Sequence, residues 1–374
     1  MEVKKCYKQT EVGVIPEDWE VDCIENLAHI TTGGKNTQDR VDDGQYPFFV
    51  RSQNVEHINS YSFDGEAVLT AGDGVGTGKV FHYINDKFDA HQRVYRISEF
   101  TDRINGYFFY LYFSSHFYNR IMQMTAKSSV DSVRREMIAR MLIPIPPTKA
   151  EQEAIAGALR DADELITALE KLIAKKRNIK QGAMQQLLTG KKRLPGFSGE
   201  WEYQPFGDVL LRLNAKEHQI QTIDYQPIGS YPVVDQGKES VIGYSDRHDR
   251  RFQCPQGGVI VFGDHTCIVK FVDFDFVVGA DGTQILAAKS GQNTRFHAFQ
   301  LQHSGIPTTG YNRHFKFLKE RTFKVPSLAE QTAIAAILSD MDLEIERLEQ
   351  KLDKYKMLKQ GMMQELLTGR IRLV

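Results

Sequence analysis

Residues 147–194 read PTKAEQEAIAGALRDADELITALEKLIAKKRNIKQGAMQQLLTGKKRL, and residues 326–373 repeat this pattern without a gap as PSLAEQTAIAAILSDMDLEIERLEQKLDKYKMLKQGMMQELLTGRIRL. The two copies are identical at 25 of the 48 aligned positions, and the offset between them is 179 residues throughout. A constant offset means that neither copy has gained or lost a helical turn. A repeat of this length defines the domain organisation of the chain and is considered before any shorter motif.

Each copy predicts one long helix. Pro147 and Pro326 stand just before its start, where a missing N–H costs nothing, and Gly190 and Gly369 stand where a glycine commonly ends a helix. Apolar residues recur at the alternating spacing of three and four that is typical of a coiled-coil seam: Leu159, Ala162, Ile166, Leu169 and Ile173 in the first copy, and Leu338, Met341, Ile345, Leu348, Leu352 and Tyr355 in the second. Leu358, Met362 and Leu366 then step by four, which predicts a wider apolar stripe near the end.

The two helices are expected to pair with each other. One such helix alone cannot bury its apolar stripe, whereas two in one chain can. The sequence therefore predicts an intramolecular, antiparallel coiled coil with pseudo-twofold symmetry, with helices of about 40 residues and about 60 Å. The alternative is two ordinary amphipathic helices in separate cores, but the conserved register over the repeat argues against it.

The composition is that of an ordinary water-soluble protein of two or three domains. The chain has 374 residues, of which 41% are hydrophobic and 25% charged, and no run approaches the length of a membrane span. We expect a cytoplasmic protein, because there is also no hydrophobic stretch of a secretion signal in MEVKKCYKQTEVGVIPEDW. The four cysteines lack the close pairs of a zinc site, and a cytosolic disulfide would be unusual, so we expect free thiols. The net charge is only −1, so a role on nucleic acid would depend on local basic patches or on partners that share the contacts.

A globular segment rich in short strands precedes each helix. In residues 1–146, β-type runs at 47–50, 67–70, 80–83 and 94–97 are followed by an aromatic run at 104–124 that predicts a buried helix. Residues 195–325 repeat this plan more loosely, since 231–234 matches 46–49 and 258–264 matches 67–73. The sequence therefore predicts an α+β protein with two mixed, mostly antiparallel β-rich domains, which we call the first head and the second head.

Two motifs with possible catalytic or cofactor chemistry fail on their spacing. Gly72 to Val80 resembles a phosphate-binding loop, but Asp73 replaces the first glycine and Val80 replaces the hydroxyl residue after Lys79. Cys254, His265 and Cys267 lack a nearby fourth ligand for a metal. We found no methyltransferase or nuclease constellation and expect neither a cofactor, a metal nor catalysis. Asp73 and Asp264 follow corresponding strands, where a structural role in the turn is the simpler interpretation.

Polar loop clusters in both heads carry the residue types that read base edges: Arg and Lys for guanine, Asn and Gln for adenine. Each cluster alone is more often solvated surface, but the clusters recur at corresponding places, which favours a DNA-binding role. The predicted DNA-binding residues are Arg51, Ser52, Gln53, Asn54, Lys79, His91, Gln92, Arg93, Lys127, Ser128 and Ser129 in the first head, and Gln236, Lys238, His265, Thr266, Lys270, Tyr311, Asn312, Arg313 and His314 in the second.

This organisation resembles the specificity subunit of type I restriction-modification systems. The resemblance rests on two variable segments that alternate with two near-identical helices, each opening PxxAEQxAIA and closing KQGxMQxLLTGxxRL, and on the lead Ile15-Pro16-Glu17-Asp18-Trp19. It covers nearly the whole chain. It implies target recognition domains at 1–146 and 195–325 and conserved helical regions at 147–194 and 326–374.

The resemblance also implies the function and the partners. Each head would read one half of a split sequence in the major groove of double-stranded DNA. The helices would set the distance between the halves and dock two methyltransferase subunits, and restriction subunits that translocate DNA would join them, with no membrane involved. The residues that match the helical motif and are expected to bind partners are Ala150, Glu151, Gln152, Ile155, Gln181, Ala329, Glu330, Gln331, Ile334 and Gln360. Whether they face a methyltransferase or the other helix stays open.

Two other classes of function remain as alternatives. A coiled-coil scaffold that binds proteins without reading DNA would suit the near-neutral charge. A stand-alone methyltransferase or nuclease is weaker, because its motifs are absent from the sequence.

Overall fold

The computed structural model describes residues 6–124, 132–306, 310 and 312–373. The chain forms two compact units: Met1–Leu169 together with Lys351–Val374, and Glu170–Gln350. We call them unit 1 and unit 2 and describe each by itself. The division into four segments stays a prediction, because each unit combines one head with parts of both helical regions.

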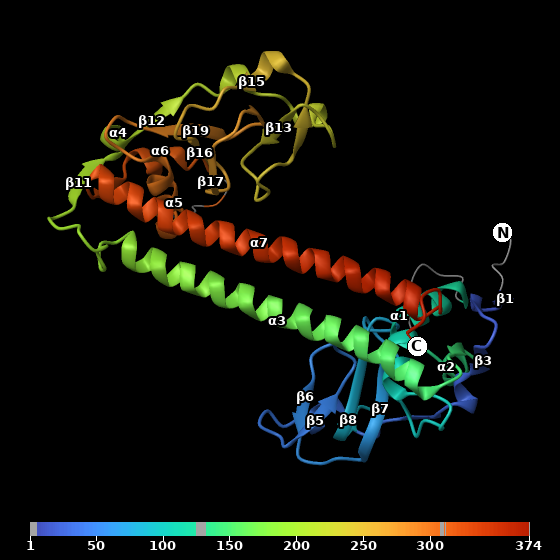
Figure 1. Ribbon diagram of the computed structural model, residues 1–374. Coiled ribbons are helices and arrows are strands. Elements are labelled where there is room, and N and C mark those ends of the chain that lie inside the picture. The colour runs from blue at the N-terminus through green and yellow to red at the C-terminus, as the bar shows by residue number, and fades with distance from the viewer. Residues whose placement is uncertain (1–5, 125–131, 307–309, 311, 374) are drawn as a thin grey trace. The chain divides into compact units, whose positions relative to one another are not determined.

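The two predicted long helices are confirmed as α3 (Lys149–Leu187) and α7 (Leu328–Leu366), each of 39 residues (Figure 1). The hydroxyl of Thr148 accepts a hydrogen bond from the backbone N–H of Glu151 at 3.2 Å, which satisfies one of the free donors at the start of α3. Gly190 and Gly369 have φ angles of +71° and +69°, a conformation that favours glycine after a helix.

Both units show antiparallel pairing of the helices. In unit 2, Met184, Leu187 and Leu188 of α3 and its end cluster with the first turns of α7, while Arg177, earlier in α3, pairs with Glu349 at 2.5 Å. In unit 1, Ile155 and Leu159 cluster with Leu366 and Leu367, while Asp163, farther along α3, pairs with Lys359 at 2.5 Å. The predicted antiparallel coiled coil is therefore confirmed.

One detail of the predicted seam is wrong. Leu358 is 52% exposed, so the apolar stripe does not widen there. The partly buried positions Leu352, Tyr355, Lys359 and Met362 keep the alternating spacing of three and four. Leu358 therefore lies on the outer side of α7, whereas the predicted widening occurs in the last turns, where residues 361–363 and 365–367 are all partly or fully buried.

The first head contains a six-stranded sheet in the order β4-β9-β7-β8-β5-β6. All neighbours are antiparallel except β5 and β8, which run parallel. The strands are β4 (His29–Thr32), β5 (Tyr46–Phe49), β6 (Glu56–Ile58), β7 (Phe63–Ala71), β8 (Phe81–Ala90) and β9 (Val94–Ser98). Two small antiparallel pairs accompany the sheet: β1 (Tyr7–Thr10) with β2 (Gly13–Pro16), and β3 (Glu20–Cys23) with β10 (Leu142–Ile145). A short helix, α2 (Arg135–Ala139), precedes β10.

The second head repeats this topology with one interruption. Its sheets have the orders β12-β19-β16-β17 and β14-β13-β18-β15, so β17 and β18 together take the place of the single long strand β8. The strands are β12 (Leu210–Leu213), β13 (Tyr231–Val234), β14 (Gly243–Ser245), β15 (Arg251–Phe252), β16 (Val259–Gly263), β17 (Val269–Val272), β18 (Phe276–Val278) and β19 (Thr283–Ala288). The pair β11 (Glu202–Pro205) and β20 (Thr322–Val325) corresponds to β3 and β10, and short helices α4 (Phe206–Val209) and α6 (Phe315–Lys319) complete the head.

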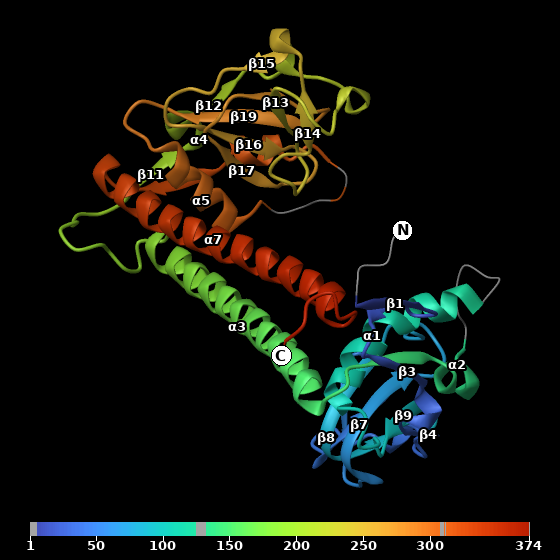
Figure 2. The same ribbon diagram turned by 45° about the vertical axis from the view of Figure 1, so that its right-hand side comes forward.

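A buried helix joins each sheet to the long helices. In the first head it is α1 (Gly106–Met124), whose Phe108, Phe109, Phe113 and Phe117 are fully buried, as predicted for the aromatic run. In the second head it is the shorter α5 (Thr294–Ser304), which lies between the sheet and α7 (Figure 2). The two heads therefore use the same layers: a sheet, a buried helix and the long helices.

A buried carboxylate in the first turn of each long helix is paired with an arginine from beyond the end of the other. In unit 1, Glu151 is 2% exposed and receives Nη2–H of Arg372 at 2.7 Å. The guanidinium carbon of Arg372 lies 5.9 Å from the Trp19 ring centre. The hydrogen bonds with Glu151, opposed in part by burial, raise the pKa of Arg372. In unit 2, Arg193 makes two 2.6 Å bonds to Glu330 beside Trp201.

We expect Arg372→Met to lower the free energy of unfolding by about 3 kcal/mol, because it leaves Glu151 buried and unpaired. This is the lower end of the range for breaking a buried pair, since the Arg372 side chain is 27% exposed. Urea denaturation measures the change. Arg370→Met is the matched control, because Arg370 is 61% exposed and pairs with Glu365 at the surface. Adding Glu151→Met to Arg372→Met should recover much of the loss; no recovery would show that the cost arises elsewhere.

Candidate nucleic-acid interface

Four segments of the first head meet at one end of its sheet. They are 50–54 after β5, 72–80 between β7 and β8, 91–93 before β9, and 132–134 before α2. Backbone hydrogen bonds join them: His91 N–H donates to the Phe49 carbonyl at 2.9 Å, Gly72 N–H to the Arg93 carbonyl at 2.8 Å, and Val133 N–H to the Gly72 carbonyl at 2.7 Å. The loops predicted to read DNA are therefore neighbours in the first head.

Two of the predicted arginines share one carboxylate. Nη1 of Arg51 lies 2.8 Å from Oδ1 of Asp73, and Nε of Arg93 lies 3.7 Å from Oδ2. Asp73 is 27% exposed, while Arg51 and Arg93 are 44% and 65% exposed. Asp73 therefore pairs with two arginine side chains in addition to its place in the turn, a contact that was not predicted from the sequence.

Most of the other predicted residues of the first head that the structure describes face solvent. Gln53, Asn54, Lys79 and Gln92 are exposed. The Lys79 ammonium lies 5.5 Å from the Tyr118 ring centre, and the Gln92 amide donates to Asn36 Oδ1 at 2.7 Å. The Ser52 hydroxyl is partly buried and accepts from the Asn54 N–H at 2.9 Å. Lys127, Ser128 and Ser129 lie outside the described residues.

His91 is a wrong prediction as a base-reading residue. Its side chain is buried, and Nδ1 accepts a hydrogen bond from the Arg93 N–H at 3.0 Å. Burial, with a further contribution from the charge of Arg51, lowers the pKa of His91, so the ring is neutral at pH 7. His91 orders the turn that presents Arg93 instead of contacting a base itself.

The second head brings the corresponding segments together. Gly279 N–H donates to the Val234 carbonyl at 2.8 Å, Asp264 N–H to the Gly282 carbonyl at 2.7 Å, and His314 N–H to the Asp264 carbonyl at 2.8 Å. These bonds join 279–282 to the end of β13, and 264–268 to both 279–282 and 312–314. The predicted recurrence of the loop clusters is confirmed.

Fewer of the predicted residues in the second head reach solvent. Lys238, Thr266, Asn312 and Arg313 are exposed, and His265 is partly buried. Although Thr266 is exposed, its hydroxyl donates to the Gln236 carbonyl at 2.6 Å. Tyr311 lies outside the described residues.

Three predicted base readers of the second head serve the fold instead. The amide of Gln236 donates to the Asp281 carbonyl at 2.8 Å and accepts from the His265 N–H at 3.2 Å. His314 is fully buried, with Nδ1 3.0 Å from the Asp264 carbonyl oxygen. Lys270 is 10% exposed at its side chain and also points inward. The structural role expected for Asp264 is confirmed, because its carboxylate accepts from the Phe315 N–H at 2.8 Å.

Strands β8 and β17 each follow the turn of a β-hairpin. In both strands the second residue binds backbone carbonyl groups of the loop that follows the parallel strand β5 or β13. In the first head, His82 Nε2 lies 3.0 Å from the Ser52 carbonyl oxygen, and burial lowers the pKa of His82. In the second head, the Lys270 ammonium donates to the carbonyls of Asp235, at 3.0 Å, and Glu239. His82 was not predicted, because a histidine inside a strand carries no signal for such a contact.

Six of the ten residues expected to bind partners are buried within their own unit, which contradicts a surface role for them. Ile155 and Ile334 belong to the apolar clusters, and Glu151 and Glu330 form the ion pairs described above. Gln152 accepts from the Asn105 N–H at 2.7 Å and donates to the Arg103 and Pro146 carbonyls. Gln331 makes the corresponding contacts with the Asn293 N–H and the Pro326 carbonyl. Ala150, Gln181, Ala329 and Gln360 are exposed.

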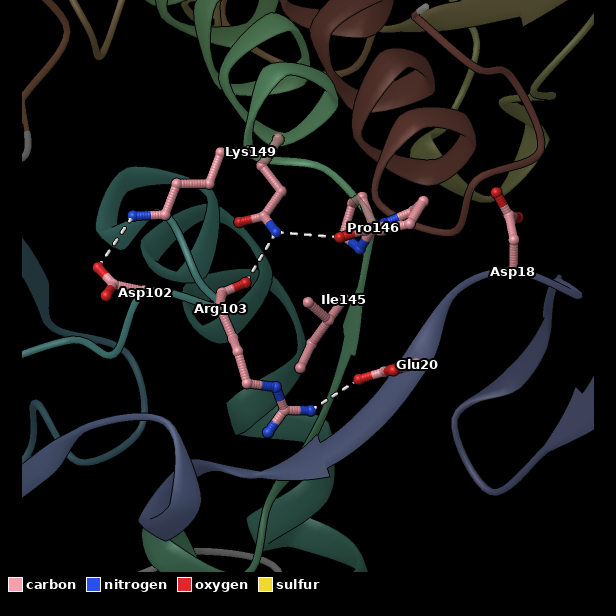
Figure 3. A pocket seen from close by; sticks show the side chains of 9 residues that line it. Asp18, Glu20, Asp102, Arg103, Ile145, Pro146 and Lys149 are labelled. Atoms are coloured by element: carbon pink, nitrogen blue, oxygen red, sulfur yellow. Dashed lines mark hydrogen bonds and ion pairs between the residues drawn. The ribbon is translucent and has the colours of Figure 1, made fainter.

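A pocket of about 400 Å³ lies where α3 begins, but its charged groups are already paired (Figure 3). Arg103 binds Glu20 at 2.8 Å, and Lys149 lies 3.7 Å from Asp102. Asp18, at the edge, pairs with Arg372 at 3.0 Å. The pocket is therefore explained by the packing of the head against the helix, and we assign no ligand to it.

Comparison with known proteins supplies the class. The family model described as type I restriction modification DNA specificity domain matches residues 16–181 and again 199–355. The chain therefore belongs to the specificity subunits of type I restriction-modification systems. Among the described residues, no helix has the length and apolar character needed to cross a membrane.

Individual relatives agree with this assignment. The chain is 24% identical to a putative type I restriction enzyme MjaX specificity subunit of Methanocaldococcus jannaschii, in an alignment that covers 98% of this chain and 97% of that protein. It is 31% identical to the EcoDI specificity subunit of Escherichia coli over 45% of this chain, an alignment that spans only 36% of the E. coli protein. The solved structure of the S subunit from M. genitalium matches with a TM-score of 0.70 at 15% identity, covering 93% of this chain and 96% of that one.

We expect Lys270→Met to loosen the loop 235–240 of the second head, because the change removes the ammonium that binds the Asp235 and Glu239 carbonyls. Limited trypsin digestion should then cut after the exposed Lys238 at least several times faster, with an unfolding cost of about 1–3 kcal/mol. Lys289→Met is the control, because Lys289 is exposed. Unchanged cleavage after Lys238 would show that the ammonium does not hold the loop.

Proposed function

We propose that this subunit reads a split DNA sequence with its two heads and holds the catalytic subunits of its complex on its helices. The observation that carries the proposal is the recurrence of converging polar loops at corresponding strand ends in two heads of the same topology. A chain with two such surfaces is suited to recognise two half-sites. The chemistry of methylation and cleavage would belong to two methyltransferase subunits and to restriction subunits that translocate DNA, in the cytoplasm where the DNA lies.

The exposed loop residues are suited to direct readout. Arg51 and Arg93 offer the N–H pairs that bind guanine O6 and N7, and Asn54 and Gln53 offer the amides that bind adenine. In the second head, Arg313 and Asn312 supply the same two chemistries, while Lys238 is a compact charge suited to a phosphate. The net charge of −1 indicates that partner subunits would contribute part of the phosphate contacts.

The long helices are suited to set the spacing between the half-sites. A helix of 39 residues is about 58 Å long, which exceeds one turn of DNA at about 34–36 Å. Their outward faces are available for partners, since Leu165, Leu172 and Ile179 recur every seven residues along α3 and are 36–47% exposed. On α7, Leu343 and Met357 are 47% and 66% exposed. These faces, with Ala150, Gln181, Ala329 and Gln360, are the proposed docking surface for methyltransferase subunits.

A protein-binding scaffold that does not read DNA is the second candidate, and the near-neutral net charge favours it. Methylation mapping distinguishes the two. A host expressing this chain with its methyltransferase should carry one split methylated motif that disappears when the chain is omitted. If an active, folded methyltransferase complex leaves no motif, the scaffold is the better description.

Removing one heptad from each long helix should shorten the spacer of that motif by about three base pairs. Seven residues correspond to about 10 Å of helix, and a deletion of seven preserves the seam. The deletions belong between Asp163 and Lys180 in α3 and between Asp342 and Lys359 in α7, which retains the ion pairs of these residues. Both half-sites should be unchanged. A spacer of the original length would disprove the role of the helices as a ruler.

Arg51→Ala and Arg313→Ala should each impair one half-site and leave the other unchanged. Loss of a bidentate contact with guanine costs about 1–3 kcal/mol of discrimination at one position. The measurement is the methylated motif of each variant, with Lys289→Ala as a surface control. If either variant weakens methylation at all sequences alike, the arginine contacts phosphate instead of a base.

A further inference from the structure

We infer that Asp73 is a specificity-determining positioning residue, which holds the Arg51 guanidinium for a guanine in the half-site of the first head. This inference rests on the proposed function and goes beyond it, because it assigns a base to one half-site and a role to a carboxylate. The carboxylate of Asp73 binds Arg51 through Oδ1 at 2.8 Å and faces Arg93 through Oδ2 at 3.7 Å.

The position of the Asp73 carboxylate is constrained by its neighbours. Asp73 forms a β-bridge with Ser132, and the preceding Gly72 is bonded to both Arg93 and Val133. A side chain at Gly72 would lie 2.9 Å from the Arg93 carbonyl oxygen, and one at Gly76 would lie 2.7 Å from that of Arg51. The loop therefore packs directly against the backbone of both arginines, which fixes the position of the backbone that carries the carboxylate.

The charges distinguish base reading from phosphate binding. A phosphate is bound best by uncompensated cations, and a carboxylate beside it is repelled. Here Asp73, Arg51 and Arg93 together carry a single net positive charge, which halves the charge that the two arginines alone would offer to DNA. The carboxylate instead fixes the orientation of the Arg51 guanidinium. Its contact uses Nη1 and leaves the other N–H groups of the planar guanidinium to form a bidentate pair with guanine.

The second head uses its corresponding aspartate differently. Asp264 is 4% exposed and binds the Phe315 N–H, while Gln236 stands second after β13, where the first head has Arg51 second after β5. An aspartate at this turn is therefore not obliged to bind an arginine. The paired arginines belong to the first head and concern the sequence that this head reads.

Methylation mapping of Asp73→Asn in the complete complex tests the inference. The amide is uncharged, so it no longer fixes the guanidinium by an ion pair, and discrimination at one G·C pair of the first-head half-site should fall by roughly 5- to 150-fold. The second half-site and the unfolding midpoint should stay unchanged. Asp64→Asn is the matched control, because Asp64 is exposed on β7 of the same head and its carboxylate lies 4.0 Å from Lys87.

The double variant Arg51→Ala/Asp73→Asn separates positioning from direct contact. If Asp73 acts through Arg51, the double variant relaxes the motif no further than Arg51→Ala alone. An additional loss would show that Asp73 itself touches a base and would overturn the inference. Relaxation at an A·T pair would overturn it too, as would stronger binding to all sequences with an unchanged motif, which is the result expected of a phosphate-binding arginine.

The outcomes also separate this inference from the proposed function. Absence of any split motif with the unaltered chain contradicts the proposed function. A split motif that is identical for the unaltered chain and Asp73→Asn contradicts only the positioning role. If Asp73→Asn abolishes methylation altogether, Arg51→Lys decides. Lysine lacks the planar fork, so discrimination should fall at the G·C pair that Arg51→Ala affects, and an unchanged motif would overturn the inference.

Discussion

The architecture depends on a buried carboxylate at the start of each long helix. Glu151 and Glu330 are 2% and 1% exposed, and a carboxylate at such a position is stable only with a cation beside it. The cation comes from the segment that follows the other long helix: Arg372 for Glu151 and Arg193 for Glu330. Each unit therefore ties the start of one helix to the end of the other, which fixes the antiparallel direction of the pair. The neighbouring glutamines, Gln152 and Gln331, bind the backbone of the head and fasten the same helix ends to it.

The elements of the fold were largely predictable, because they follow from periodicity. The coiled-coil spacing and the gapless repeat predict both helices, and the aromatic run predicts α1. The direction in which the repeated residues of the two helices face was not predictable. Glu151 in the first turn of a helix is equally consistent with a solvated residue favoured by the helix dipole. Its partner, Arg372, lies 221 residues away in the chain, and no local pattern connects them. A repeated motif indicates a constraint, but not whether a partner protein or the chain itself imposes it.

The candidate interface was predictable as a region and only partly as a set of residues. Loops that follow neighbouring strands converge, so grouping them by position in the two heads was sufficient. Within a loop, however, no period separates inward from outward side chains. His91, His314, Lys270 and Gln236 have the polar chemistry of base readers, yet each is used to satisfy backbone groups in its own head. A tightly turned loop leaves N–H and carbonyl groups that no strand pairs, and polar side chains satisfy them first.

In each head, the cluster beside the long helices is separate from the cluster beneath the loops, which explains how the loops can differ while the scaffold is retained. In the first head, the long helices pack into the cluster around Trp19, whereas the strand ends that carry the loops enclose another cluster around Phe49 and Phe88. In the second head, the corresponding clusters surround Trp201 and Val234, and a further cluster surrounds Phe262. A substitution in a loop therefore acts mainly on the cluster beneath it. The same loop is held by a neutral His82 in one head and by a charged Lys270 in the other, so even the residue that orders the loop can change. Trp19, Glu151 and Arg372 have no such freedom, and neither do Trp201, Glu330 and Arg193. Removing one member of either set leaves a buried group without its partner.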